Sequence, residues 1–186
     1  MNVTVRRGRE HAERFEGEDV SFETVDGVRL VGTLGPAPDD DPNAPIVVFC
    51  HEFTATRHSA VRYAWFLREA GFRVFTFDFR AHGDSGCPQG YAPRQWATQG
   101  EIFDLHAALR WLRGKNRSPD SIGNGVKGPG PVFSPVALFG ISRGAVVALS
   151  VAEADPSAVA VVSDGAFSTI DTLDAYRVAR ARRLSQ

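Results

Sequence analysis

The stretch that most constrains this chain runs from Val136 to Val151, with the sequence VALFGISRGAVVALSV. Four mostly apolar residues lead into Gly140-Ile141-Ser142-Arg143-Gly144, and small apolar residues follow, so the pattern predicts a strand, a tight turn and a helix. The two glycines are explained if a side chain there would collide with the neighbouring strand or helix. Ser142 would then lie at the tip of the turn, facing free backbone N–H groups of the helix, where a serine can act as a nucleophile.

Bulk composition limits the class of protein. With 186 residues, 43% hydrophobic and 23% charged, the chain has the make-up of a soluble globular protein of one domain, which we expect to be cytoplasmic. A net charge of −1 argues against a nucleic-acid partner, and no apolar run is long enough to span a membrane. The acidic run Asp39 to Asp41 is interpreted as a solvated loop and not as a cation site, and no cofactor or metal is expected.

The first part of the chain predicts an arm followed by a hairpin. Residues 1–19 are polar and aperiodic and are interpreted as a flexible N-terminal arm, with a single domain over residues 20–186. Within that domain, Val20–Val25 and Val28–Leu34 are predicted strands, and Asp26-Gly27 is the turn between them.

A strand, a helix and a second strand are predicted next. Ile46–Cys50 is wholly apolar, as is typical of a strand buried on both faces in a parallel sheet. Ser59–Ala70 has an amphipathic pattern and is followed by Gly71, which predicts a helix that ends there. Val74–Phe79 is the next apolar strand, so this region predicts a βαβ unit.

The second half of the chain continues the alternation. Thr98–Arg113 is a predicted amphipathic helix that begins with capping-box spacing and ends at Gly114. Lys115–Pro135 has no periodicity and is interpreted as a mobile loop. Beyond the Ser142 turn, Ala158–Val162 is a predicted buried strand and residues 168–186 a final amphipathic helix.

Two further segments accompany the serine motif and carry a family resemblance. His51-Glu52-Phe53 follows one predicted strand, and Asp78-Phe79-Arg80-Ala81-His82-Gly83-Asp84-Ser85 follows the next. With G-x-S-x-G around Ser142, they resemble the α/β-hydrolase family, closest to its serine-aminopeptidase and lysophospholipase-like branch, over residues 20 to 170. The resemblance implies an α/β three-layer sandwich with a mostly parallel sheet. Glu52 and Ala81 depart from it, because the family has glycine at both positions.

The resemblance also implies a reaction. Ser142 would be the nucleophile, and the backbone N–H groups of Phe53 and Arg143 would form the oxyanion hole. The implied function is hydrolysis of a carboxylic ester or an amide or peptide bond of a small-molecule substrate, through an acyl-serine intermediate and with no cofactor.

Other polar residues of the same segments receive bracing roles. In the family the segment that holds Asp78, Arg80 and His82 organises the loops beside the site, so we expect these residues to be structural. The tetrapeptide Gly83-Asp84-Ser85-Gly86 resembles the G-D-S-G motif of trypsin-like peptidases. That motif belongs to all-β folds, whereas Ser85 follows a strand between two helical patterns, so we reject it as a nucleophile.

The general base is the missing component. In the family the acid and then the histidine follow the serine, but all five histidines of this chain precede Ser142. His51 is the best candidate base if its strand neighbours that of Ser142; the alternative is a loop histidine bonded to backbone. Asp164 ends a predicted strand where a minority of the family places the acid; the alternative is a helix cap.

Three interpretations remain open. The chain matches roughly the first two-thirds of a hydrolase domain and lacks the last strands, which indicates a truncated or split product. Such a product is expected to be weak or inactive alone, and a partner chain would complete it. A second interpretation is a non-catalytic binding module with this fold. The third is a self-sufficient hydrolase with an unusual base. The first would leave the edge of the last strand open to a partner chain or to self-association.

Overall fold

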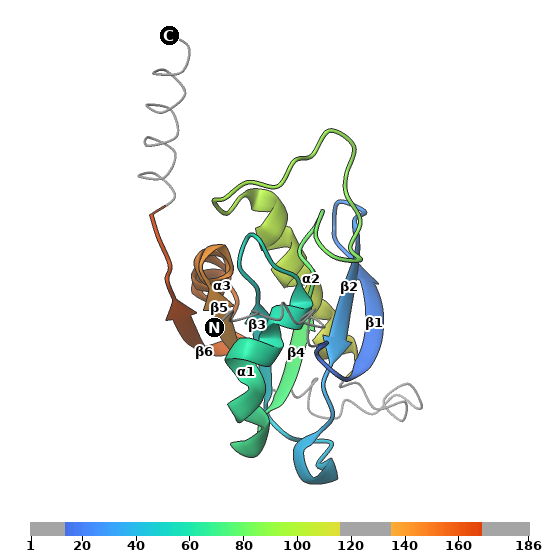
Figure 1. Ribbon diagram of the computed structural model, residues 1–186, viewed down its shortest axis with the longest axis vertical. Coiled ribbons are helices and arrows are strands. Elements are labelled where there is room, and N and C mark those ends of the chain that lie inside the picture. Colours follow the sequence, from blue (N-terminus) through green and yellow to red (C-terminus); the bar gives the residue numbers. More distant parts are fainter. Residues whose placement is uncertain (1–13, 116–134, 169–186) are drawn as a thin grey trace, which may run out of the picture.

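The computed structural model describes residues 14–115 and 135–168. The strands within these ranges form one six-stranded mixed sheet (Figure 1). The strands lie in the order β1-β2-β4-β3-β5-β6. β1 and β2 run antiparallel to their neighbours, while β4, β3, β5 and β6 are parallel to one another. The bounds are β1 (Glu18–Glu23), β2 (Arg29–Leu34), β3 (Ile46–Cys50), β4 (Arg73–Phe77), β5 (Val136–Ile141) and β6 (Ala158–Asp164).

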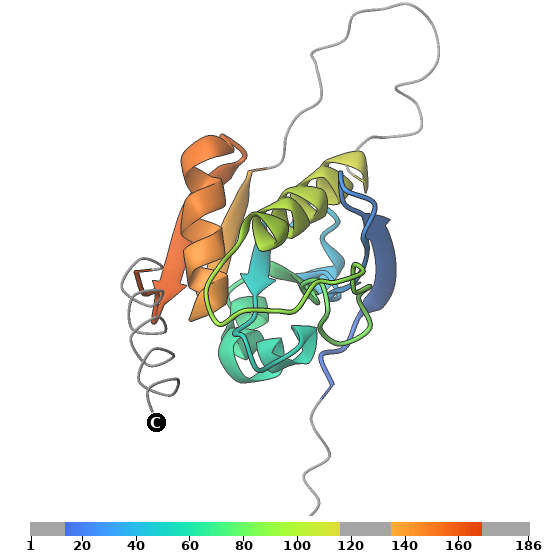
Figure 2. The same ribbon diagram turned by 90° about the horizontal axis from the view of Figure 1, so that it is seen from above.

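Within the described residues, three α-helices cover the two faces of this sheet. They are α1 (Ala60–Glu69), α2 (Gln99–Lys115) and α3 (Arg143–Ala154), with short 3-10 turns η1 (Pro38–Asp40) and η2 (Arg57–Ser59). Figure 2 shows α1 and α2 on opposite sides of the sheet. The predicted three-layer α/β sandwich with a mostly parallel sheet is therefore confirmed.

The alternation of side chains along β3 explains the layers. Val48 and Cys50 belong to the core cluster that also contains residues of α2 and α3, whereas Phe49 packs in the cluster with Ala60 and Ala64 of α1. Successive residues of a strand point to opposite faces, so a strand between two helical layers must be apolar throughout. All five residues of β3 are buried, as its uninterrupted apolar sequence predicts.

The hairpin is confirmed, with shifted boundaries. β1 begins at Glu18 and ends at Glu23, and its register pairs Glu18 with Leu34. The backbone N–H of Thr24 donates to the Val28 carbonyl at 3.0 Å, so the loop closes across residues 25–27 and not across Asp26-Gly27 alone. Gly27 has a φ of 79°, which is the left-handed conformation that glycine adopts without strain.

Helix ends agree with the predicted signals in most places. Gly71 has a φ of 84° and donates its N–H to the Arg68 carbonyl at 3.0 Å, which ends α1. At the start of α2, the Thr98 N–H donates to the Glu101 carboxylate at 2.9 Å, the capping-box bond. The predicted end of this helix at Gly114 is wrong, since α2 runs to Lys115. The predicted loop at 115–135 and the final helix at 168–186 lie, apart from their end residues, outside the described residues.

β6 forms one border of the described sheet. It pairs with β5, and no other strand of the described residues lies along its outer edge. The predicted strand is confirmed, but its predicted burial is wrong within the described residues, because Val159 is 64% exposed and Val162 is 56% exposed although both are strongly apolar. An apolar strand with a free edge is a surface on which another polypeptide can pair. Separately, none of the helices in the described ranges combines the length and apolar character that crossing a membrane requires.

Candidate functional site

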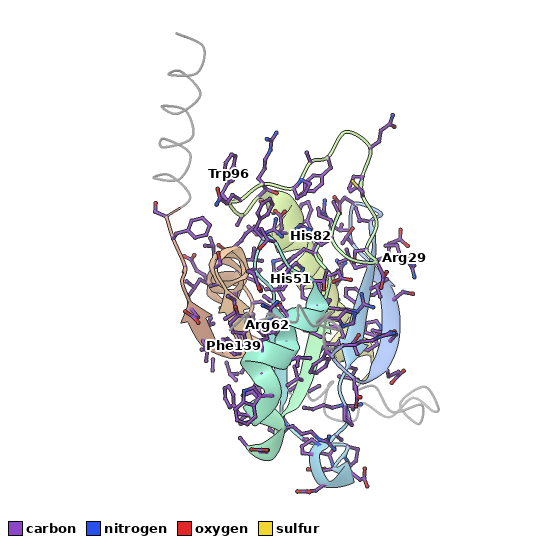
Figure 3. All side chains as sticks on the ribbon, in the orientation of Figure 1. Arg29, His51, Arg62, His82, Trp96 and Phe139 are labelled. Carbon is purple, nitrogen blue, oxygen red and sulfur yellow. The ribbon has the colours of Figure 1, made fainter. Side chains whose placement is uncertain are left out.

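The carboxyl ends of β3, β4 and β5 meet at one end of the sheet. β3 lies between β4 and β5 and is parallel to both, so the loops that follow these strands converge. The rings of His51 and His82, which follow β3 and β4, have centroids 5.2 Å apart. Figure 3 shows both at this end of the molecule, with Trp96 farther out. The three segments that the sequence singled out are therefore brought together by the sheet order.

Ser142 occupies the turn between β5 and α3 in a strained conformation. Its φ is 53° and its ψ is −117°, a combination that costs a residue with a side chain of order 1–3 kcal/mol. The surroundings hold it there: its N–H donates to the Asp164 carbonyl at 2.7 Å, and its own carbonyl accepts the N–H of Ala145 at 3.0 Å. Strain of this kind persists where neighbouring structure over-determines the backbone, and it is found at functional sites.

The two glycines of the turn are explained by close backbone approaches. A Cβ at Gly140 would lie 2.4 Å from the carbonyl oxygen of Gly144. A Cβ at Gly144 would lie 2.2 Å from the carbonyl oxygen of Cys50 at the end of β3. The reason inferred from the sequence is confirmed, because each glycine lets one segment of backbone lie directly against another.

Arg143, the first residue of α3, sends its side chain into the centre of the site. The side chain is fully buried, and its guanidinium carbon lies 5.1 Å from the ring centroid of Phe53. The backbone N–H of Arg143 is in the first turn of α3, where an α-helix has no acceptor of its own for its N–H groups. The structure thus brings Phe53 and Arg143, the two predicted oxyanion residues, into contact through their side chains.

His82 ties the loop after β4 to the loop after β3. Its Nε2 lies 2.8 Å from the carbonyl oxygen of Phe53, and its Nδ1 lies 2.8 Å from the carbonyl oxygen of Arg80. The imidazole therefore lies between backbone carbonyls of the two loops, and in its neutral form it donates its one N–H to one of them. This is the bracing role that the sequence predicts for His82.

Asp78 forms the buried anchor of the same region. Its carboxylate accepts the backbone N–H of Arg57 at 2.7 Å and that of Asp84 at 3.0 Å, and it forms an ion pair with the Arg57 guanidinium. Arg57 also pairs with the exposed Asp84 at 2.8 Å. Sequence reasoning missed Arg57, because nothing in its local pattern separates it from a solvated arginine.

A second buried arginine connects the hairpin to α2. Arg80 donates its backbone N–H and its Nε to Asp104, both at 2.9 Å, and its guanidinium pairs with Asp26 at 2.8 Å. Burial raises the pKa of Asp104 to about 6, against the opposing effect of Arg80. The Arg80 hydrogen bond lowers the pKa of Asp26 to about 2. The expected bracing role of Arg80 is thus realised through two carboxylates that sequence reasoning did not select.

Ser85 and Asp164, two further residues considered from the sequence, both form hydrogen bonds with neighbouring segments. The Ser85 hydroxyl donates to the Asp78 carbonyl at 2.7 Å and accepts the Val31 N–H at 2.9 Å, which gives it a bracing role. Asp164 is the last residue of β6 and lies beside Ile141 in the register, with its carbonyl bonded to Ser142. Its carboxylate is at the exposed end of the strand. Asp164 therefore lies next to the serine turn, as an acid from this strand would.

His51 is buried beneath the loops and bonds to backbone through both ring nitrogens. Its Nδ1 lies 2.7 Å from the Glu52 carbonyl, and its Nε2 accepts the N–H of Phe79 at 3.1 Å. Burial lowers the pKa of His51 to about 3, so the ring is neutral at pH 7. This geometry favours the alternative of a backbone-bonded loop histidine over a base for Ser142.

The buried His51 predicts a loss of stability in acid. Because the pKa of His51 is about 3 in the folded protein and 6.5 in an unfolded chain, only the unfolded chain takes up this proton between those pH values. Above pH 6.5 this group does not lower the free energy of unfolding. As the pH falls from 6.5 toward 3, the free energy of unfolding decreases by roughly 1.4 kcal/mol per pH unit. Urea unfolding at several pH values should show this slope in the wild type and a shallower one in His51→Gln. Equal slopes would contradict the assignment.

The described ranges contain no group of three or more His, Cys, Asp or Glu side chains placed to hold a metal ion. Cys50 is fully buried, and burial raises the pKa of its thiol, as expected for an unreactive cysteine.

Comparison with known proteins agrees with this arrangement. The family model for serine aminopeptidase S33 matches residues 41–184. An uncharacterized protein of Mycobacterium tuberculosis is 30% identical over 146 residues, which cover 78% of this chain and 44% of the relative. The chain thus spans less than half the length of that relative.

Solved structures show the same fold. The esterase Pf2001 of Pyrococcus furiosus superposes with a TM-score of 0.61 at 29% identity, covering 84% of this chain and 54% of that one. A protein of unknown function from Agrobacterium tumefaciens, at 24% identity and a TM-score of 0.57, covers 78% of this chain and 59% of its own and shares the fold alone. From the family match and the strand-turn-helix geometry around Ser142, we conclude that this chain belongs to the serine aminopeptidase S33 family of α/β-hydrolases.

Proposed function

We propose that this chain carries the nucleophile and the oxyanion hole of a hydrolase acting on a carboxylic ester or an amide bond. The observation that carries the proposal is the strained turn at Ser142, between a buried strand and the first turn of α3. Such a turn presents the serine hydroxyl at the carboxyl end of the sheet and leaves the N–H groups of the helix start beside it.

The proposed chemistry is acyl transfer. The Ser142 oxygen attacks the substrate carbonyl carbon, its proton passes to a base, and the carbonyl oxygen becomes an oxyanion. The backbone N–H groups of Arg143 and Phe53 would donate to that oxyanion. Collapse of the tetrahedral intermediate expels the alcohol or amine and leaves an acyl-serine, which water then hydrolyses.

We propose that the base comes from polypeptide beyond the described residues, either a further segment or a partner chain. Two observations support this: His51 bonds to backbone through both ring nitrogens, and the relative from Mycobacterium tuberculosis is more than twice as long as the matched part. The free edge of β6 is where we propose that such polypeptide docks. Asp164 beside the serine turn is a candidate acid for that base.

The substrate class rests on chemistry and on the esterase neighbour. An activated ester expels a leaving group that needs no proton, so it is the substrate for which residual activity is expected without the base. Without its base, a triad enzyme keeps roughly 10³ to 10⁴-fold acceleration over water, from binding and the oxyanion hole. The chain alone is therefore proposed to be a weak hydrolase.

The test uses a fluorophosphonate probe and a p-nitrophenyl ester. We expect slow covalent labelling of the wild type at Ser142, located by peptide mass spectrometry, and weak ester turnover. Ser142→Ala should lose both, because the attacking oxygen is gone. Ser150→Ala is the matched control, since this exposed serine lies on the same helix, α3, and donates to the Val146 carbonyl of that helix at 2.9 Å.

Two outcomes would contradict the proposal. Labelling that persists in Ser142→Ala would place the reaction elsewhere. A wild type that is never labelled, while an ester ligand raises the melting temperature of wild type and Ser142→Ala equally, would favour the non-catalytic binding module.

A further inference from the structure

We propose that the side chain of Arg143 is a positioning residue for the oxyanion hole, holding the loop that contains Phe53 against the turn that contains Ser142. This inference rests on the proposed function, in which Arg143 and Phe53 each supply one backbone N–H. One residue would then provide the first donor from its backbone and fix the second donor with its side chain.

The first line of evidence is the contact between Arg143 and two aromatic rings. The guanidinium carbon lies 5.1 Å from the ring centroid of Phe53 and 5.4 Å from that of Phe79. A planar guanidinium on aromatic faces gains both electrostatic attraction and dispersion, and the attraction is stronger where water is excluded. The Arg143 side chain is fully buried, so this contact fixes the position of the Phe53 ring.

The second line of evidence is a separate connection to the Phe53 backbone. Nε2 of His82 lies 2.8 Å from the Phe53 carbonyl oxygen and 3.3 Å from Nη2 of Arg143. With its proton on this nitrogen, His82 donates to the Phe53 carbonyl, so its approach to Arg143 is a packing contact and not a second hydrogen bond. Phe53 is therefore held at its ring by Arg143 and at its carbonyl by His82, which Arg143 also contacts. Fixing these two points restricts the orientation of the Phe53 main chain, including its N–H group.

The opposite side of the guanidinium is anchored to α2 and the segment before it. Nη1 donates to the Arg94 carbonyl at 3.0 Å and lies 3.5 Å from the Glu101 carboxylate. Glu101 is itself fully buried and is held by the Thr98 N–H and by the Tyr91 hydroxyl. Arg143 thus has a rigid support on one side and the Phe53 loop on the other.

The burial of the Arg143 charge indicates that this side chain positions the loops around it and does not serve mainly to stabilise the fold. When both residues of a buried ion pair are replaced by apolar residues of similar volume, the protein often loses no stability. Here, moreover, Nε of Arg143 is buried and has no hydrogen-bond partner among the described residues. Burying a charged guanidinium costs desolvation free energy that an apolar side chain would not. The guanidinium, however, contacts several loops at once and holds them in one arrangement.

The test measures the Phe53 loop directly, by hydrogen–deuterium exchange of a peptide that covers residues 51–56. In Arg143→Met we expect exchange in this peptide to become at least about tenfold faster, while peptides from β3 and β5 stay protected. Arg113→Met is the matched control, because Arg113 forms an ion pair with Asp155 away from the Ser142 turn. It should leave the 51–56 peptide unchanged.

Two further variants separate positioning from simple stability. Arg143→Met with Glu101→Gln removes both buried charges, so the melting temperature should recover toward the wild type while fast exchange at residues 51–56 remains. If Arg143→Met does not fold, Arg143→Lys carries the same test, since an ammonium keeps the charge near Glu101 but cannot contact Arg94, His82 and the Phe53 ring together. Unchanged exchange in Arg143→Lys, or exchange in the double variant that recovers together with stability, would overturn the proposal.

The exchange readout does not depend on catalysis. If wild-type Ser142 proves unreactive, the proposed function fails, yet the exchange experiment still shows whether Arg143 holds the Phe53 loop. If Ser142 is labelled, Arg143→Met should lower the labelling rate about a hundredfold, the typical effect of losing one oxyanion donor. Normal labelling despite a mobile loop would show that Phe53 is not a donor and would overturn the proposal.

Discussion

Gly144→Ala is expected to destabilise the protein by about 3 kcal/mol or more, or to prevent folding, although alanine is the better helix former. Gly144 lies in the first turn of α3, and an added Cβ would be 2.2 Å from the Cys50 carbonyl oxygen and 2.6 Å from that of His51. Both atoms belong to the backbone at the end of β3, so neither can move aside as a flexible side chain would. Urea unfolding followed by circular dichroism measures the change.

The chain contains a matched control for this prediction. Gly114 is also a helical glycine, in α2, but an added Cβ there meets nothing within 4 Å. Gly114→Ala should therefore be neutral or should stabilise the protein by roughly 0.5–1 kcal/mol. If the two variants proved equally stable, the close approach of α3 to β3 could not be the reason for the glycine, and the geometry proposed around Ser142 would be wrong.

Asp78→Asn is expected to lower the free energy of unfolding by about 3 kcal/mol, the lower end of the range for breaking a buried ion pair. Both carboxylate oxygens are occupied: one accepts the Arg57 N–H, and the other accepts the Asp84 N–H and pairs with the Arg57 guanidinium. Whichever way an asparagine is turned, its NH₂ group faces one of these donors. The Arg57 charge would also lose its buried counter-charge.

Asp84→Asn provides the comparison, because Asp84 pairs with the same arginine. The Asp84 side chain is 68% exposed, whereas that of Asp78 is fully buried. Exposed ion pairs contribute about 0–1 kcal/mol, and an asparagine oxygen can still accept the Arg57 hydrogen bond at this position. Denaturant midpoints of the two variants under one set of conditions measure the difference. Similar losses in both would show that burial does not set the strength of this network.

The strand and helix pattern was largely predictable, because it depends on local sequence. The uninterrupted apolar run Ile46–Cys50 predicted a doubly covered strand, and β3 is that strand. Gly71 predicted the end of α1 correctly. Gly114 did not end α2, since a glycine permits the left-handed conformation without requiring it, and α2 continues through Gly114 to Lys115.

Some residues of the candidate site could likewise be predicted from local sequence, and others could not. The motif residues Ser142 and Phe53 could be selected from the sequence, because their positions relative to strand ends follow a pattern. The roles of Arg57, Asp26 and Glu101 could not. Each makes its decisive contact with a residue far along the chain, as Arg57 does with Asp78 and Glu101 does with Arg143.

The sequence by itself determined the α/β layering and the turn at Ser142, because apolar periodicity and glycine spacing act over a few residues. Only the tertiary structure decided how the loops around that turn are held. It placed His51 between the Glu52 carbonyl and the Phe79 N–H, and it buried Arg143 among Phe53, His82 and Glu101. The physical reason is that hydrogen bonds and ion pairs depend on distances in space, which are set only when β3, β4 and β5 come together in the sheet.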